Sequence, residues 1–200
     1  MKPTNPQLLV ILTAPSGAGK TTIAQALAGE IPELSFSVSA TTRVPRAGEV
    51  AGRDYYFMPA EEFEQKIEAG AFLEYEMVYA GKYYGTLSSE LDRIWHAGQF
   101  PLRVVDVIGA LDLKAKFGDR ALSIFIQPPS IAVLEERLKE RGTENHRTLE
   151  ERITKAHTEM EFASRFDHVI VNDRLGHAVQ QIAALVRRFI GAAQDQRSSV

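Results

Sequence analysis

Apolar runs alternate with segments of helical periodicity along most of the chain. The first apolar run, Leu8–Leu12, leads through a short loop into a segment of helical pattern at 22–28. Further strand-like runs lie at 36–40, 102–108, 122–127 and 169–171. Near-continuous apolar character is typical of strands buried on both faces, and strands that alternate with helices form parallel sheets. We therefore predict an α/β fold with a parallel five-stranded sheet flanked by helices.

Capping and stop residues set the expected helix ends. Ser88 or Ser89 is predicted to cap a helix that ends at Gly98, and Ser130 a helix through Arg141. Thr148 has the capping-box spacing to Glu151. The expected helices therefore include 88–97, 130–141, 148–162 and 175–190, with one more ending at Phe117. The residues from 193 to 200 are polar and expected to be frayed.

The stretch from 41 to 86 breaks the alternation of strands and helices. It contains a loop at 41–49, strand-like runs at 55–57 and 72–79, a helix at 59–69 and a predicted turn at 81–86. A proline, glycines and arginines mark the first loop. We expect an inserted α+β subdomain here.

A glycine loop joins the first strand to the first helix. In such a loop, consecutive backbone N–H groups and the helix N-terminus can hold a phosphate chain. Lys20 would reach the terminal phosphates, and the Thr21 hydroxyl would ligate Mg²⁺. A strict phosphate-loop pattern asks for glycine where this chain has Ala14. A tight strand–helix turn is the plainer alternative, but the flanking elements favour a nucleotide site. The predicted nucleotide-binding residues are Ala14, Pro15, Ser16, Gly17, Ala18, Gly19, Lys20, Thr21 and Thr22.

Two arginines and two tyrosines of the stretch 41–86 suit a second phosphate. The guanidinium forks of Arg43 and Arg46 match phosphate oxygens, and the phenols of Tyr55 and Tyr84 donate single hydrogen bonds. Composition alone equally allows a solvated loop and tyrosines that pack a small sheet.

Ser39 and Glu74 are candidates for reading a nucleobase. A carboxylate accepts two hydrogen bonds side by side, which suits the N1–H and N2–H₂ edge of guanine and repels the acceptor N1 of adenine.

Composition excludes several classes of function. The chain of 200 residues has a formal net charge of −3 and no cysteine. No thiolate site or disulfide framework is available, and the charge does not favour nucleic acid or a membrane surface as partner. The five-residue apolar run near the N-terminus fits a strand better than a signal peptide, and no run approaches membrane-spanning length. The histidines lack metal-ligand spacing. We expect a cytoplasmic protein.

Several motifs together resemble the guanylate kinase family. They are the stretches 14–20, 39–50, 52–57 and 83–85, and the likeness runs from about Leu8 to Ile190. Alanine at position 14 is normal in that family. The resemblance implies a parallel-sheet core (about 7–38, 87–129 and 164–192), a GMP-binding insertion (39–86) and a helical lid (130–163).

The resemblance assigns most of the candidate residues. Arg43, Arg46, Tyr55 and Tyr84 fall on the phosphate contacts of GMP, and Ser39 and Glu74 on its base contacts. Thr86 stands where the family often has serine near the nucleotide.

One position departs from the family pattern. Val104 replaces the first of two aspartates, while Asp106 keeps the second. In the family the first aspartate serves the guanine side, so recognition of guanine should depend more on Ser39 and Glu74. Asp106 should order Mg²⁺ through water. The alternative for Asp106 is a buried, neutralised or capped carboxylate.

The resemblance also indicates residues that act on ATP. Arg141 and Arg152, with Arg137 as a third, match lid arginines that neutralise charge on the transferring phosphoryl group. Asn172 matches a residue near adenine. The plainer alternatives are that the three arginines are exposed charges on helices and that Asn172 caps a helix.

The resemblance implies transfer of the γ-phosphoryl group of ATP to GMP, and also to dGMP, with ADP and GDP as products in purine nucleotide metabolism. ATP and Mg²⁺ are the implied cofactors. Two alternatives stay open: a related kinase that acts on a phosphorylated ribose, and a non-catalytic binding module, which the intact Gly19-Lys20-Thr21 disfavours.

Overall fold

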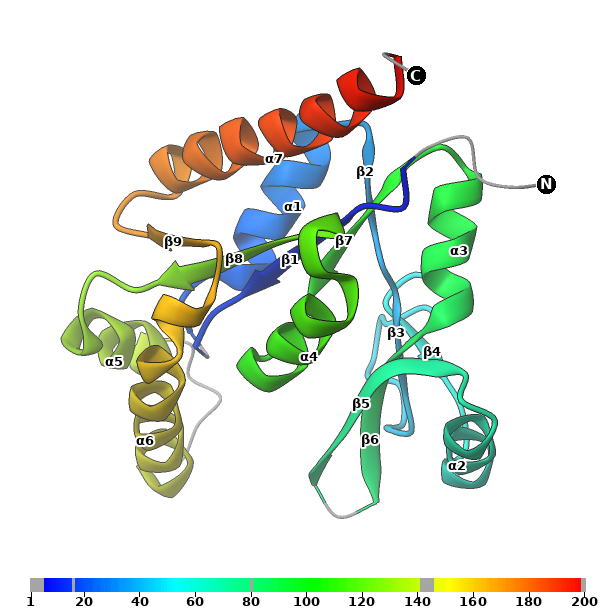
Figure 1. Ribbon diagram of the computed structural model, residues 1–200. Helices are drawn as coiled ribbons and strands as arrows, with labels where there is room; N and C mark the ends of the chain where they lie inside the picture. The colour runs from blue at the N-terminus through cyan, green and yellow to red at the C-terminus, as the bar shows by residue number, and fades with distance from the viewer. Residues whose placement is uncertain (1–5, 16, 80, 141–145, 199–200) are drawn as a thin grey trace.

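The computed structural model describes residues 6–198 except 16, 80 and 141–145. Its main sheet has five parallel strands in the order β2-β7-β1-β8-β9 (Figure 1). In spatial order these are β2 (Leu34–Phe36), β7 (Phe100–Val104), β1 (Leu9–Thr13), β8 (Ala121–Gln127) and β9 (His168–Val171). The predicted five-stranded parallel sheet is confirmed.

Helices cover both faces of this sheet (Figure 1). They are α1 (Lys20–Glu30), α3 (Ser88–His96), α4 (Val107–Phe117), α5 (Ile131–Glu140), α6 (His146–Glu161) and α7 (Leu175–Ser198). Alternate side chains of β1 point to opposite faces, as in any strand. Val10 and Leu12 join the cluster that holds α1, α5 and α7, whereas Leu9 and Ile11 join the cluster that holds α3 and α4. The central strand is therefore buried on both sides, which explains its continuous apolar run.

A second sheet is formed by residues that lie between β2 and β7 along the chain. It has four strands in the order β4-β3-β6-β5, with β3 parallel to β4 and antiparallel to β6. The bounds are β3 (Ser39–Thr41), β4 (Tyr55–Phe57), β5 (Phe72–Tyr79) and β6 (Lys82–Leu87), and α2 spans Ala60–Glu68. Phe63 of α2 stacks on Phe72 and Tyr83, with ring centroids 4.2 and 5.2 Å away. This subdomain therefore has an apolar core of its own.

A buried carboxylate links the two sheets. Glu90 of α3 is only 2% exposed. It accepts hydrogen bonds from the Val38 amide (2.9 Å) and the Tyr56 hydroxyl (2.8 Å) and pairs with Arg93. Since Val38 lies between β2 and β3, Glu90 holds the point where the chain crosses from the core into the second sheet.

Three strand predictions need correction. Residues 82–86, expected as part of a turn, belong to β6, because this segment pairs with β5 over most of its length. The run 36–40 is divided between β2 and β3, which belong to different sheets. The strand expected to reach Ile108 ends at Val104, because the Asp106 carboxylate accepts a hydrogen bond from the Gly109 amide (2.8 Å) and caps α4.

The helix ends also differ in part from the prediction. Ser130 caps α5 through the Val133 amide, as expected. Leu87 rather than a serine precedes α3, without a side-chain cap. Thr148 lies inside α6 and not at its start, and α7 continues through the stretch expected to be frayed, as far as Ser198.

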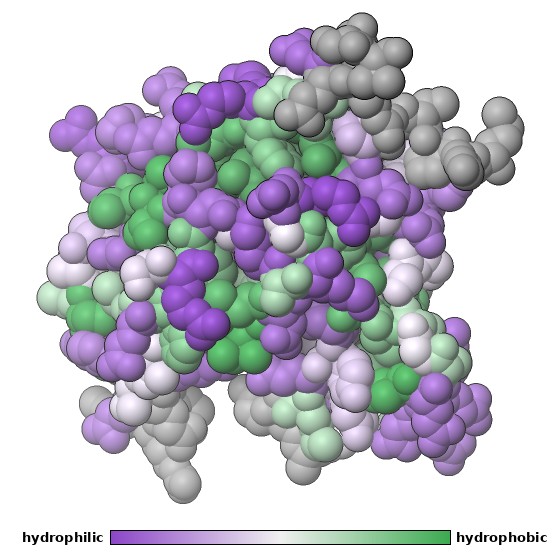
Figure 2. Space-filling model, viewed as in Figure 1, coloured by the Kyte–Doolittle hydropathy of each residue, from purple (hydrophilic) through white to green (hydrophobic). Residues whose placement is uncertain are grey.

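Hydrophilic residues cover most of the face seen in Figure 2, with apolar residues in patches between them. Within the described residues, no helix combines the length and apolar character needed to cross a membrane.

Candidate active site

The glycine loop between β1 and α1 has the backbone that its sequence requires. Gly17 and Gly19 adopt φ values of 88° and 95°, a region that side chains with a Cβ rarely enter. The Ala18 amide donates to the Pro15 carbonyl (3.2 Å), and the Lys20 ammonium group donates to the Ala14 carbonyl. Ser16 lies outside the described residues. The Lys20 side chain therefore folds back over the loop at the start of α1.

Distant parts of the chain support the loop from behind. A Cβ on Gly17 would lie 2.9 Å from the Leu138 side chain of α5. The Asn172 amide group, which is buried, donates to the Ala18 carbonyl (2.9 Å). Arg137 donates to the Asn172 carbonyl (3.1 Å). The structure therefore places Asn172 and Arg137 beside the phosphate loop.

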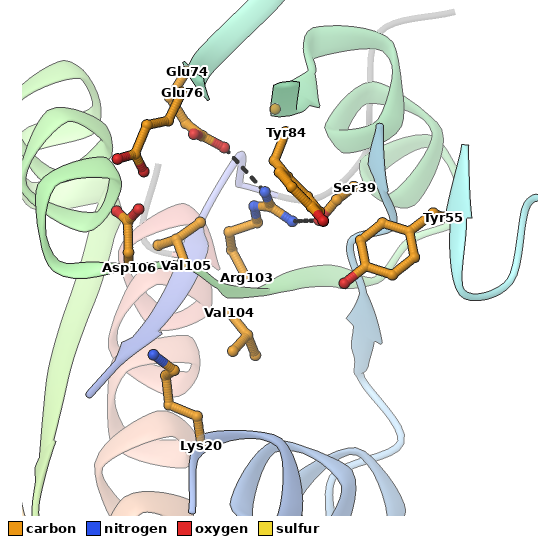
Figure 3. A pocket seen from close by; sticks show the side chains of 11 residues that line it. Lys20, Ser39, Tyr55, Glu74, Glu76, Tyr84, Arg103, Val104, Val105 and Asp106 are labelled. Carbon is orange, nitrogen blue, oxygen red and sulfur yellow. Dashed lines mark hydrogen bonds and ion pairs between the residues drawn. The ribbon is translucent and has the colours of Figure 1, made fainter. Parts of the chain in front are cut away.

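A cavity of about 290 Å³ separates the loop from the second sheet (Figure 3). Residues from both sheets line it. Those predicted from the sequence are Lys20, Ser39, Tyr55, Glu74, Tyr84 and Asp106. A second cavity of about 510 Å³ includes Thr21, Ser39, Tyr55 and Glu49 in its wall. Thr21 and Thr22 are exposed in the first turn of α1.

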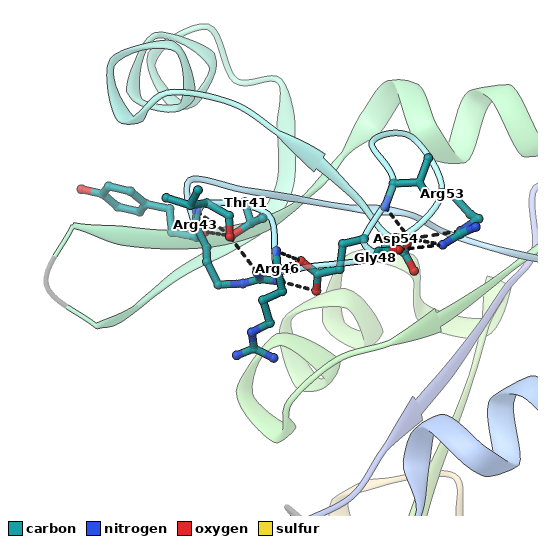
Figure 4. Close-up of polar contacts among 10 residues, drawn as sticks. Thr41, Arg43, Arg46, Gly48, Arg53 and Asp54 are labelled. Atoms are coloured by element: carbon teal, nitrogen blue, oxygen red, sulfur yellow. Dashed lines mark hydrogen bonds and ion pairs between the residues drawn. The ribbon is translucent and has the colours of Figure 1, made fainter. Parts of the chain in front are cut away.

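The arginine–tyrosine cluster is partly assembled. The Arg43 guanidinium forms two 2.8 Å hydrogen bonds with the Glu49 carboxylate (Figure 4). These bonds raise the pKa of Arg43 and help to lower the pKa of Glu49 to about 2. Arg43 also lies over the Tyr55 ring (5.2 Å to the centroid), and Tyr55 meets Tyr84 edge to face. The Arg46 side chain extends away from this contact and is exposed (Figure 4).

Ser39 and Glu74 are joined by a residue that the sequence analysis missed. Arg103 of β7 donates to the Ser39 hydroxyl (2.7 Å) and to the Glu74 carboxylate (3.0 Å), as Figure 3 shows. Thr86 donates to the same Glu74 oxygen. A charged residue in an otherwise apolar, buried strand is costly unless it is paired. That rule was the available signal for Arg103.

A pair of carboxylates forms the wall of the cavity next to α4. Hydrogen bonding to Asp106, helped by partial desolvation, raises the pKa of Glu76 to about 7. Burial opposes ionisation of Asp106, but hydrogen bonds from Glu76 and Gly109 and the charges of Lys155 and Lys20 keep its pKa below the ordinary value. Burial lowers the pKa of Lys20 against the attraction of Glu159 and Asp106. The pair therefore shares one proton near neutral pH. Glu76 was missed, although its spacing of two from Glu74 puts both on one face of a strand.

The predicted lid arginines divide between two helices. Arg137 is half-buried on α5 and Arg152 is half-buried on α6, and the two helices pack together. Arg141 lies outside the described residues.

The fold and the site together define a class of nucleotide-binding protein. A five-stranded parallel sheet whose central strand runs through a glycine loop into a helix is the architecture of phosphate-loop nucleotide-binding proteins. The second sheet provides a further pocket that faces the loop lysine.

Comparison with known proteins then gives the family. A model of the guanylate kinase family matches residues 7–189. The chain belongs to the guanylate kinase family.

Individual relatives are similar over nearly their whole length. The chain is 50% identical to a guanylate kinase of Chlorobium chlorochromatii over 183 residues, which are 92% of this chain and 96% of the relative. It is 48% identical to one of Porphyromonas gingivalis, covering 91% and 97%. The crystal structure of guanylate kinase from Anaplasma phagocytophilum superimposes with a TM-score of 0.72 at 29% identity, covering 95% of this chain and 88% of the other.

Proposed function

We propose that this protein transfers the γ-phosphoryl group of ATP to GMP, giving ADP and GDP. The observation that carries the proposal is one cavity whose wall includes Lys20 of the phosphate loop, Tyr84 of the second sheet and Glu74. A donor phosphate held by the loop and an acceptor held by the second sheet would meet there. In-line transfer needs positioning and charge neutralisation more than covalent chemistry by the protein.

The proposed acceptor site takes the phosphate of GMP between the guanidinium groups of Arg43 and Arg46 and the hydroxyls of Tyr55 and Tyr84. The geometry in support is the contact of Arg43 with both tyrosines. Because Glu49 holds Arg43 in place, its carboxylate must share or release the guanidinium when a phosphate dianion binds. The base lies toward Ser39, Glu74 and Thr86.

The proposed donor site uses the loop residues 14–22, with Lys20 on the β- and γ-phosphates and Arg137, Arg141 and Arg152 closing over them. Asn172 is assigned to the adenine side by resemblance, and its buried amide supports the loop itself. The ranges 39–86 and 130–163 are proposed as the moving parts. A cytoplasmic location stays a prediction from the sequence.

Mg²⁺ is the metal proposed for this reaction. It prefers oxygen ligands and keeps several waters, so one hydroxyl and one carboxylate suffice beside the phosphates. Thr21 and Asp106 are such donors, and the lowered pKa of Asp106 keeps its carboxylate ionised. Among the described residues, no group of three or more acidic or imidazole side chains forms a metal site. When bound, the ion would neutralise charge on the β- and γ-phosphates.

A coupled assay of ADP release tests the proposal with GMP, dGMP, AMP and ribose phosphates side by side. We expect turnover with GMP and dGMP and at least ~10²-fold lower efficiency with AMP, since a buried base edge left unpaired costs ~1–3 kcal/mol per group. Turnover of a ribose phosphate without turnover of GMP would contradict the proposal, and binding of GMP without any turnover would favour a non-catalytic module.

Replacement of Lys20 by alanine separates the donor from the acceptor site. Lys20→Ala should abolish turnover while calorimetric GMP affinity changes less than about twofold. Lys66→Ala, at an exposed ion pair on α2, is the matched control and should keep wild-type turnover. Retained activity in Lys20→Ala would remove the loop lysine from the reaction.

A further inference from the structure

Arg103 stands out because it is a charged residue in the buried core sheet. It lies on β7 between Leu102 and Val104, and its side chain is 5% exposed. Burial of a guanidinium group is costly unless carboxylates or other acceptors surround it. No helix capping or surface role explains a cation at this position.

The partners of Arg103 are the residues that are assigned to the base of GMP. Its terminal nitrogens donate to the Ser39 hydroxyl on β3 (2.7 Å), to the Glu74 carboxylate on β5 (3.0 Å) and, at longer distance, to the Ser37 carbonyl (3.4 Å). Its Nε is buried and has no hydrogen-bond partner within the described part of the chain. Arg103 also contributes to the walls of both cavities. A strand of the core sheet thus carries a hydrogen-bond donor into the base pocket.

The order of donors and acceptors along this wall matches guanine. Guanine presents N2–H₂ and N1–H as donors next to the acceptors O6 and N7. Glu74 accepts from the first two, and a guanidinium beside it is placed to donate to O6. Arginine paired with O6 and N7 of guanine is the commonest specific contact between proteins and bases. Adenine would set its N6–H₂ donor against Arg103 and its N1 acceptor against Glu74.

We propose that Arg103 is a specificity-determining residue that donates to the O6 edge of guanine, beside the edge that Glu74 accepts. The inference rests on the proposed function of the pocket. Val104, where the family resemblance implies an aspartate, lines the same cavity, so this wall presents a donor and no carboxylate at that position. The chain therefore reads guanine by an acceptor from the second sheet and a donor from the core sheet.

Base analogues separate this role from a purely supporting one. 6-Thio-GMP keeps N1–H and N2–H₂ but replaces O6 by sulfur, a weak acceptor. IMP keeps N1–H and O6 but lacks the N2 amino group. The ratio of kcat/KM for GMP to that for 6-thio-GMP therefore reports the O6 contact, and the ratio of GMP to IMP reports the Glu74 contact.

The experiment measures both ratios for the wild type, Arg103→Met and Glu74→Gln. The wild type should prefer GMP to 6-thio-GMP by about tenfold or more, the size of a charge-assisted hydrogen bond. Arg103→Met should lower that ratio to about two or less and leave the GMP-to-IMP ratio within about threefold. Glu74→Gln should do the reverse. A GMP-to-6-thio-GMP ratio that is unchanged in Arg103→Met would overturn the proposal and leave Arg103 as a support for Glu74.

Two further variants protect the test against misfolding. Arg103→Lys keeps the charge but loses the planar fork, so its GMP-to-6-thio-GMP ratio should fall while thermal melting stays near that of the wild type; an unchanged ratio there would also overturn the proposal. Arg187→Met removes a remote ion pair with Glu30 on the surface and should leave both ratios unchanged. If the wild type fails to turn over GMP, the proposed function fails instead.

Discussion

Two glycines, Gly17 in the phosphate loop and Gly48 in the loop between β3 and β4, show that a missing Cβ can be required for two different reasons. Gly17 and Gly48 have nearly the same backbone, with φ values of 88° and 87°. A Cβ on Gly17 would meet the side chains of Leu138 and Leu134 at about 3 Å, whereas a Cβ on Gly48 would have nothing within 4 Å. Backbone strain is thus common to both sites, whereas crowding around a Cβ occurs only at Gly17 of these two.

The two alanine variants should therefore differ in stability. Gly48→Ala is expected to lower the free energy of unfolding by about 1 kcal/mol, from the positive φ alone. Gly17→Ala should lower it by about 2–3 kcal/mol, because the buried side chains of Leu138 and Leu134 must also shift. Urea unfolding measures both values. Equal losses would mean that Leu138 moves aside without cost.

The site residues that were predicted belong to sequence motifs, whereas the site residue Arg103 that was missed does not. Lys20, Tyr55, Glu74, Tyr84 and Asp106 carry recognisable motifs, and the structure brings them to one cavity. Arg103 carries no motif, since only the pairing of β7 with β1 and β2 and the approach of the second sheet give it partners. These partners are brought to Arg103 by tertiary structure, and the spacing of residues along the chain does not predict such contacts.

At the scale of elements, the end of β9 supports the loop after β1. The Asn172 amide N–H donates to the Ala18 carbonyl, and the backbone amide of Asn172 continues the pairing with β8 by donating to Gln127 (2.8 Å). The strand ladder thereby fixes where the side chain points. A Cβ on Gly19 would lie 2.6 Å from the Asn172 amide nitrogen, so the fit between the two segments is tight.

Removal of this amide should weaken the binding of ATP more than that of GMP. We expect Asn172→Ala to raise KM for ATP about three- to tenfold, to leave KM for GMP within about twofold, and to cost about 1–2 kcal/mol of unfolding free energy. Steady-state kinetics and urea unfolding measure these effects. Asp173→Ala, an exposed neighbour whose carboxylate accepts from the Arg174 amide, is the control. Equal changes in both KM values would contradict a local role at the loop.

The prediction of strands was right where a strand is buried along its whole length, and wrong where pairing with other strands determines the structure. Continuous apolar runs in the sequence indicate the core strands. Residues 82–87 contain a glycine and two tyrosines and look like a turn, but the ladders to β5 and β3 make them a strand. An apolar residue such as Val107 fits a buried strand and a buried helix equally well. The cap supplied by Asp106 makes it the first residue of α4.

At the scale of the whole molecule, the cavity lies between two separately packed bodies, and each contributes one member of the carboxylate pair. Glu76 comes from β5 of the second sheet, and Asp106 comes from the core, where it caps α4. The raised pKa of Glu76, about 7 against an ordinary 4.5, means that the folded protein holds a proton that the unfolded chain releases between these values. The associated stability is present below about pH 4.5 and is lost as the pH rises through about 7.

Wild-type stability should accordingly fall relative to Glu76→Gln between pH 5 and pH 8. The amide keeps a hydrogen-bond donor for Asp106 and cannot ionise. We expect the difference in unfolding free energy to change by about 1 kcal/mol or less, because Glu76 is solvent-exposed and water screens the pair. Urea unfolding at intervals of one pH unit measures it. In an Asp106→Asn background the pH dependence of this difference should shrink, because only desolvation and the charge of Glu74 remain to raise the pKa of Glu76. An undiminished pH dependence there would assign the proton to another group.

The contact between Asn172 and Ala18 also bears on how the protein is made. The two residues are 154 positions apart, and β1 pairs with β7 and β8, whose residues follow their partners by 92 positions (Val10 with Leu102) and 112 positions (Leu9 with Ala121). During translation, the loop that contains Ala18 leaves the ribosome long before its partners are synthesised. A nascent chain therefore carries an unsupported loop through most of its synthesis, and the capacity to bind ATP is among the last properties that it acquires.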